Sequence, residues 1–154
     1  MDPQSRTLLE AFDALRPGGT LEPEVLGDPD LWRPAAEELV ARGWLRPGAE
    51  PGRYGRTEDG RLALAQPLDV TLYTRPGCHL CEEAKAQIGP LLRRAGARLW
   101  EVNIDADPAL RARYDFDVPV ILLGARKVAK HRVDLEQFRK QLEEARRGVR
   151  DDGG

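Results

Sequence analysis

The fold is decided by one stretch of the sequence, Tyr73-Thr74-Arg75-Pro76-Gly77-Cys78-His79-Leu80-Cys81. It holds the only two cysteines of the chain, and they are spaced as C-x-x-C. An apolar run over 68–73 precedes the cysteines, and an apolar stripe with helical spacing follows them. Two thiols between a strand and a helix suit a dithiol that opens and closes as a disulfide, and the same pair could supply half of a metal site.

Length and composition narrow the class of protein. The chain of 154 residues suits one ordinary domain or two small ones, and its 41% hydrophobic and 32% charged residues are typical of a soluble globular protein. It has no run of ~18 apolar residues, so we expect no transmembrane helix, and it begins without the basic and apolar segments of a secretory signal. Two cysteines at this spacing favour a redox motif in a cytoplasmic protein without membrane attachment.

A domain boundary is expected near Gln66-Pro67, where dense turn residues give way to alternating strand and helix patterns. We predict a first domain over 1–66, a second over 67–147, and a disordered tail over 148–154, which has little to bury. The first domain has 8 Lys/Arg against 12 Asp/Glu, a net charge of −4, and the rest has 16 against 14, a net charge of +2. Neither part has the clustered basic surface of a nucleic-acid binder.

The first domain combines short helices with a hairpin. Helical spacing over 8–15 and 30–42, a short helix over 22–26, a hairpin around 47–52 and a last helix capped by Thr57 give the element order. With the phrases over 39–45 and 57–62, this order resembles the winged-helix family across residues 6–65, which implies a small α+β domain. Because the domain is acidic, we favour a structural or protein-binding role over nucleic-acid binding. The basic cluster of its wing is Arg46, Arg53 and Arg56.

The second domain alternates strands and helices. We expect a strand over 69–74, then a helix whose buried stripe begins at Leu80 and which kinks or breaks at Gly89-Pro90. A strand over 100–104 and a helix over 108–114, capped by Asp107, come next. Two strands, over 118–123 and 127–131, precede a last helix capped by Asp134.

This order, with Cys78-His79-Leu80-Cys81 and Val118-Pro119, resembles the thioredoxin fold, and specifically the glutaredoxin-like proteins, over residues 67–145. The resemblance implies an α/β fold with a four-stranded sheet and flanking helices. It also implies a thiol–disulfide oxidoreductase in electron transport, in which Cys78 attacks a disulfide-containing protein or small thiol substrate and Cys81 resolves the mixed disulfide. Pro119 would be a cis proline facing the thiols, with the backbone of Val118 open to pair with an extended substrate.

Two side chains are candidates for tuning the attacking thiol. A free cysteine has a pKa of ~8.5, and the positive end of a helix favours its thiolate. His79 can add positive charge when protonated, and Arg75 is the nearest fixed cation upstream. Each of the two could equally be a plain surface residue.

Three alternatives stay open at this stage. The resemblance makes glutathione a candidate co-substrate. The chain departs from well-characterised glutaredoxins, because it has His79-Leu80 and Gly124-Ala125 where they carry Cys-Pro-Tyr-Cys and a Gly-Gly turn, and this departure counts against glutathione. We predict no resident cofactor. Zinc takes four ligands. The whole supply of Cys and His ligands is Cys78, Cys81, His79 and His131. Because His79 is adjacent to the thiols at the start of a helix, it is a poor partner ligand to both of them, and we predict no metal site within one chain. An iron–sulfur cluster or metal carried between two chains is the alternative. A redox-sensing binding module, whose N-terminal domain recruits a protein partner, is the third reading.

Overall fold

The structure is a computed structural model that describes residues 1–16 and 18–153, with side chains described as far as Gly148. The chain forms two compact units, Met1–Ala65 and Gln66–Gly154, and the division lies beside the predicted boundary at Gln66-Pro67. Within the described part of the chain, no helix has both the length and the apolar character needed to cross a membrane.

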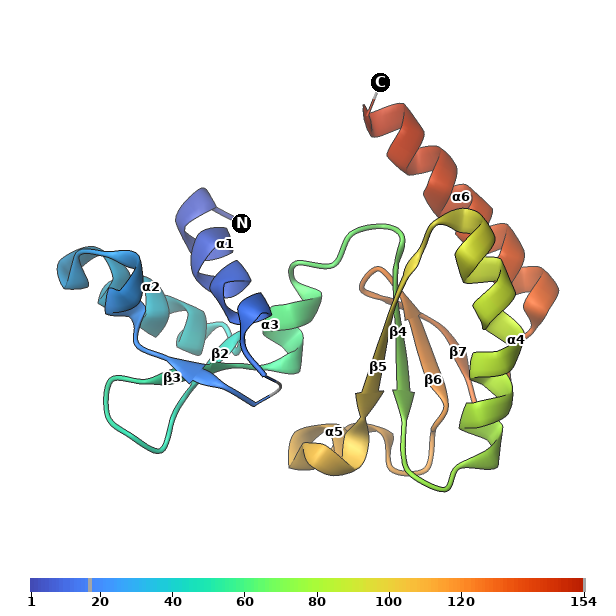
Figure 1. The fold of residues 1–154 in the computed structure, drawn as a ribbon, viewed down its shortest axis with the longest axis horizontal. Helices are drawn as coiled ribbons and strands as arrows, with labels where there is room; N and C mark the ends of the chain where they lie inside the picture. The colour runs from blue at the N-terminus through green and yellow to red at the C-terminus, as the bar shows by residue number, and fades with distance from the viewer. Residues whose placement is uncertain (17, 154) are drawn as a thin grey trace. The chain divides into compact units, whose positions relative to one another are not determined.

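The first unit combines helices with a small antiparallel sheet of order β1-β3-β2 (Figure 1). The two-residue strand β1 and the 3-10 geometry of η1 and η2 were not foreseen from the sequence. Thr57 caps α3 as predicted, since its Oγ1 accepts the N–H of Gly60 at 3.0 Å. The elements are α1 (Pro3–Glu10), η1 (Ala11–Ala14), β1 (Thr20–Leu21), η2 (Pro23–Leu26), α2 (Pro29–Ala41), β2 (Leu45–Pro47), β3 (Tyr54–Arg56) and α3 (Glu58–Leu62).

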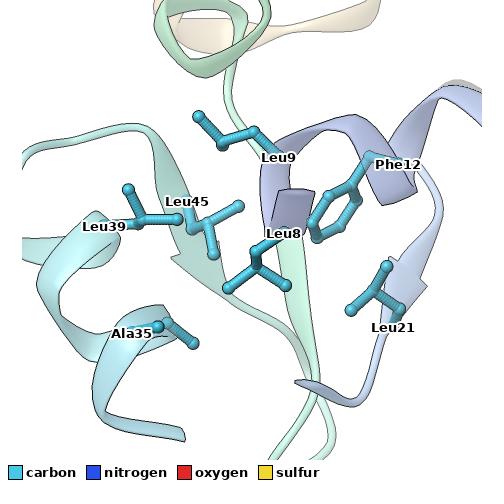
Figure 2. Packing of buried hydrophobic residues seen from close by; sticks show 8 residues of the cluster. Leu8, Leu9, Phe12, Leu21, Ala35, Leu39 and Leu45 are labelled. Carbon is cyan, nitrogen blue, oxygen red and sulfur yellow. The ribbon is translucent and has the colours of Figure 1, made fainter. Parts of the chain in front are cut away.

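The first unit has a hydrophobic core of its own. Figure 2 shows side chains from α1, η1, β1, α2 and β2 packed against one another. The helical residues contribute at i, i+3 and i+4 spacing, which places them on one face of each helix. The labelled core residues are Leu8, Leu9, Phe12, Leu21, Ala35, Leu39 and Leu45.

Two arginines of the predicted basic wing are committed to contacts inside this unit. Arg53 donates from Nε to Thr20 Oγ1 at 3.0 Å and from Nη2 to the Thr20 carbonyl at 2.8 Å. Arg56 donates from Nη1 to the Leu9 carbonyl at 2.9 Å and to Asp13 Oδ1 at 2.7 Å. These arginines therefore join β3 to β1 and to α1 and η1.

The second unit contains a four-stranded sheet of order β5-β4-β6-β7 with flanking helices (Figure 1). Strand β4 pairs with β5 in parallel and with β6 antiparallel, and β7 pairs antiparallel with β6. The predicted α/β fold of this half is thereby confirmed. Its elements are β4 (Asp69–Thr74), α4 (His79–Ala95), β5 (Arg98–Asn103), η3 (Ile104–Ala106), α5 (Pro108–Tyr114), β6 (Val120–Leu123), β7 (Arg126–Lys130) and α6 (Leu135–Gly153).

Alternation along the strands divides the core of the second unit between two faces of the sheet. One face packs against α4 and α6, which lie together on that side (Figure 1). On the other face, the ring of Tyr73 stacks on Tyr114 of α5 with centroids 4.7 Å apart. The core residues of the first face are Val70, Leu72, Ile88, Leu92, Ile121, Leu123, Phe138 and Leu142.

Helices α4 and α6 both continue through segments for which the sequence predicted an interruption or disorder. We expected a kink or a break at Gly89-Pro90. Helix α4 continues through Pro90, so a break is wrong, and a kink stays a prediction. Proline removes one backbone donor there, but Ile88 and Leu92 on either side are buried against the sheet and hold the helix in place. The helical backbone of α6 continues to Gly153, into the segment 148–154 predicted to be disordered. The side chains of that segment beyond Gly148, and all of Gly154, lie outside the described residues.

Two phenylalanines of the second unit, one buried and one exposed, allow a matched test of core packing. Phe138 is 1% exposed and Phe116 is 89% exposed. We expect Phe138→Ala to lower the free energy of unfolding by about 3–5 kcal/mol, because it leaves a cavity between α6 and the sheet. Phe116→Ala should stay within about 0.5 kcal/mol of the wild type. Urea unfolding followed by circular dichroism measures both, and equal losses would contradict this core assignment.

Two helical glycines allow a matched test of packing in α3. A Cβ on Gly60 would lie 2.1 Å from the backbone oxygen of Trp44, whereas one on Gly89, apart from its neighbours in the helix, would meet the flexible end of Arg93 at 3.4 Å. Alanine is the better helix former by ~1 kcal/mol, so Gly89→Ala should raise the thermal unfolding midpoint. Gly60→Ala should lower it, because backbone must move. A rise for both variants would show that α3 does not pack against Trp44 in this way.

Candidate functional site

The site begins where the chain leaves the central strand. All residues of β4 are buried, and after Thr74 the chain turns through Pro76 and Gly77. Gly77 has a φ of 77°, and the N–H of Cys78 donates to the carbonyl of Arg75 at 3.4 Å. Proline followed by a residue with positive φ is the pattern of a type II turn, for which glycine is the favoured residue. The Pro-Gly pair thus brings Cys78 to the start of α4.

Cys78 and Cys81 form a disulfide, with their Cα atoms 5.3 Å apart. Cys78 is the N-cap of α4, and its sulfur accepts the backbone N–H of Cys81 at 3.2 Å. Cys78 is half-buried, whereas Cys81, in the first turn, is 1% exposed. The two sulfurs therefore differ in access, and the accessible one lies at the positive end of the helix dipole.

The two residues between the cysteines both face solvent. His79 is exposed at the first position of α4, and its tuning role stays a prediction. Leu80 is 37% exposed, so its predicted burial is wrong. The buried stripe of α4 starts one residue later, at Cys81, and continues through Ala84. Leu80 belongs to the first turn of α4 but is not part of this stripe.

Arg75 is held by two acidic residues. Its Nη2 donates to Asp105 Oδ1 and to Asp115 Oδ1, both at 2.8 Å, and its Nη1 donates to the carbonyl of Asp115 at 2.9 Å. These hydrogen bonds, the one to Asp105 first, raise the pKa of Arg75 above its usual value, and the same contact lowers the pKa of Asp105. Arg75 thus clamps the turn before Cys78 to η3 and to the end of α5. Since its charge is offset by these carboxylates, its thiolate-tuning role stays a prediction.

The Val118–Pro119 peptide bond is cis, as predicted. Pro119 is buried and Val118 half-buried, just before β6, whose Val120 pairs with Tyr73 of β4. The backbone N–H of His131 donates to the carbonyl of Pro119 at 2.8 Å and to that of Asp117 at 3.3 Å. This pairing places the cis proline at the same end of β4 as the disulfide (Figure 1).

Several residues of this region were missed by the sequence analysis. The partners of Arg75, Asp105 and Asp115, lie 30 and 40 positions away, and no local pattern marks them. His131 was considered only as a metal ligand, yet it braces the cis-proline loop through its backbone at a φ of 65°. A positive φ in a residue other than glycine is uncommon, and the sequence carries no signal for it.

Metal binding receives no support from the geometry of one chain. Across the residues that the structure describes, no group of three or more His, Cys, Asp or Glu side chains is placed to hold a metal ion. The two cysteines are joined to each other, and His79 points into solvent.

Known proteins resemble the second unit of the chain. A family model described as "Glutaredoxin-like domain (DUF836)" matches residues 69–143. A glutaredoxin-like protein of Dictyostelium discoideum is 32% identical over 82 residues, which cover 49% of this chain and 76% of that protein. The chain belongs to the glutaredoxin-like family. An uncharacterized protein of Mycobacterium tuberculosis is 30% identical over 78 residues, covering 47% of this chain and 80% of that protein.

Solved structures resemble the same region. A protein of X. campestris is 36% identical, with 49% of this chain and 96% of that chain covered and a TM-score of 0.40. A protein of Nitrosomonas europaea is 29% identical, with 47% and 88% covered and a TM-score of 0.43. The family and the Cys78–Cys81 disulfide support a redox-type function for the glutaredoxin-like unit. The winged-helix resemblance of the first unit stays a prediction.

The clamp at Arg75 predicts a pH dependence. Because the folded-state pKa of Asp105 is lowered, this contact stabilises the fold at neutral pH and is lost as the pH falls through the lowered value. Arg75→Met should raise the pKa of Asp105 toward its ordinary 3.8. Arg111, whose Nε lies 3.6 Å from Asp105 Oδ1, is the matched control, and Arg111→Met should give a smaller rise. Carboxyl NMR titration measures both, and an unchanged Asp105 pKa in Arg75→Met would refute the clamp.

Proposed function

We propose that the chain is a thiol–disulfide oxidoreductase that uses Cys78 and Cys81 as a reversible dithiol. The observation that carries the proposal is the difference between the two sulfurs. Cys78 is accessible at the N-terminus of α4 and accepts a backbone N–H, whereas Cys81 is 1% exposed behind it. Thiolates at helix N-termini are the reactive form of cysteine in such proteins. Membership of the glutaredoxin-like family supports the same chemistry.

The proposed reaction proceeds in two exchanges. The Cys78 thiolate attacks one sulfur of the substrate disulfide, so a Cys78–substrate bond forms, the substrate S–S bond breaks, and the leaving thiolate takes up a proton. Cys81, after giving its proton to water, attacks the Cys78 sulfur and releases the second substrate thiolate. Two electrons pass from the dithiol to the substrate, and the protein ends as the disulfide present in the structure. An external thiol reductant must then restore the dithiol.

Val118 and Pro119 are the proposed substrate-binding residues. Over residues 1–16 and 18–153, neither the N–H nor the C=O of Val118 has a hydrogen-bond partner. Both groups lie at the disulfide end of the sheet, so an extended substrate can pair with them as an added strand. Backbone pairing of this kind would orient the substrate sulfur without requiring a particular side chain.

The proposed reaction also needs an electron donor that restores the dithiol. Glutathione is a candidate co-substrate and a thioredoxin-reductase system is the other, and turnover with each in turn distinguishes them.

We propose that the first unit binds a protein partner. Its Arg53 and Arg56 are engaged inside the unit, which leaves less cationic surface for nucleic acid.

Serine variants of the two cysteines test the assignment of roles. We expect Cys78→Ser to abolish reduction of a disulfide-bonded peptide, since the attacking thiolate is gone. Cys81→Ser should instead accumulate a mixed disulfide between Cys78 and the substrate, because the resolving thiol is missing. Non-reducing mass spectrometry detects this adduct as an added peptide mass, and the wild type is the control.

Full dithiol activity in Cys78→Ser would reject the proposal. So would a stable adduct on Cys81 in that variant, because it would exchange the two roles. Loss of the adduct when Cys78→Ser is combined with Cys81→Ser confirms that no other group reacts.

A further inference from the structure

The second unit exposes a few large apolar side chains. Among the described residues of the second unit, the exposed large hydrophobic side chains are Leu80, Phe116 and Leu135. Leu80 lies between the two cysteines, and Phe116 lies two residues before the cis Val118–Pro119 bond. Phe116 is 89% exposed, and the redox chemistry proposed above gives it no role.

Leu80 lies in the first turn of α4 and Phe116 in the α5–β6 loop. The start of α4 and this loop both lie at the end of the sheet where β4 ends (Figure 1). The turn that leads into α4 is joined to the α5–β6 loop by the hydrogen bonds from Arg75 to the carbonyl and carboxylate of Asp115. Asp115 immediately precedes Phe116 in the chain. A partner that reaches Cys78 therefore approaches both loops.

The exposure of Phe116 does not come from a loose loop. Asp115 on one side is held by Arg75 at 2.8 Å. Asp117 on the other side donates its N–H to the Tyr114 carbonyl at 2.9 Å, and its carboxylate lies 3.7 Å from Lys130 Nζ. Both neighbours are thus fixed and their charges are offset by cations of this chain. An aromatic side chain held in water on a braced backbone is typical of a binding hot spot.

We propose that Phe116 and Leu80 form an apolar recognition surface for protein segments that carry an apolar side chain beside their disulfide cysteine. The inference rests on the proposed function and names its substrate class. A segment paired with the backbone of Val118 brings the residues next to its cysteine over this surface. An apolar neighbour then removes Phe116 from water, whereas a polar neighbour does not. The site thereby selects protein disulfides over small hydrophilic ones.

The test uses two disulfide-bonded peptides that differ only in leucine or serine next to the cysteine. In the wild type, kcat/KM should favour the leucine peptide by about tenfold. Phe116→Ser should bring that ratio to within about twofold of unity, and the conservative Phe116→Leu should restore it. Leu135→Ser, which removes an exposed leucine from the start of α6, is the matched control and should keep the wild-type ratio.

A wild-type ratio near unity, or a ratio that Phe116→Ser leaves unchanged, overturns the inference.

Wild-type turnover of neither peptide would reject the proposed function. In that case, recognition is measured as the Kd of the same peptides with serine in place of cysteine, because these peptides cannot undergo thiol–disulfide exchange. Tighter binding of the leucine peptide that is lost in Phe116→Ser supports the surface, and equal Kd values overturn it. A wild-type dimer that dissociates in Phe116→Ser also overturns it, because the surface would then belong to a second copy.

Discussion

The burial of β4 on both faces is the constraint on which the second unit depends. Val70 and Leu72 pack toward α4 and α6, while Tyr73 packs toward α5, so the strand is fixed between two layers. Because β4 is fixed, the point where the chain leaves it at Thr74 is fixed too. The short Pro-Gly turn then leaves little freedom in where Cys78 meets the helix. The position of the reactive pair thus follows from packing that is remote from the sulfurs.

Polar contacts also hold the turn before Cys78 and the α5–β6 loop in position. Arg75 joins the turn before the disulfide to the α5–β6 loop, and the backbone of His131 joins the same loop to the end of β7. Two segments about 40 residues apart in sequence are thereby held at one end of the sheet. The charge of Arg75 is offset by the carboxylates of Asp105 and Asp115. Cys78 itself is the N-cap of α4, where the helix dipole favours a thiolate. The turn before Cys78 and the loop that contains Phe116 and Val118 are thus held together.

Local features of the second unit could be predicted from the sequence, and long-range ones could not. The cysteine spacing, the helix cap at Asp107 and the proline after Val118 each depend on a few adjacent residues, and they are present as expected. Leu80 was misassigned because the stripe fits two starting residues, and only the packing of Cys81 decides between them. The partners of Arg75 depend on topology that no window of sequence contains. Pro90 shows the reverse case, where tertiary burial overrides a strong local signal.

The proposed function assigns the two cysteines unequal roles, which are set by their positions at the start of α4. The most direct measurement is partial alkylation of the fully reduced wild-type chain with iodoacetamide at neutral pH, with each cysteine located by peptide mass spectrometry. We expect Cys78 to be labelled well before Cys81, because Cys78 is accessible at the helix N-terminus and Cys81 is buried. Equal labelling, or faster labelling of Cys81, would contradict it.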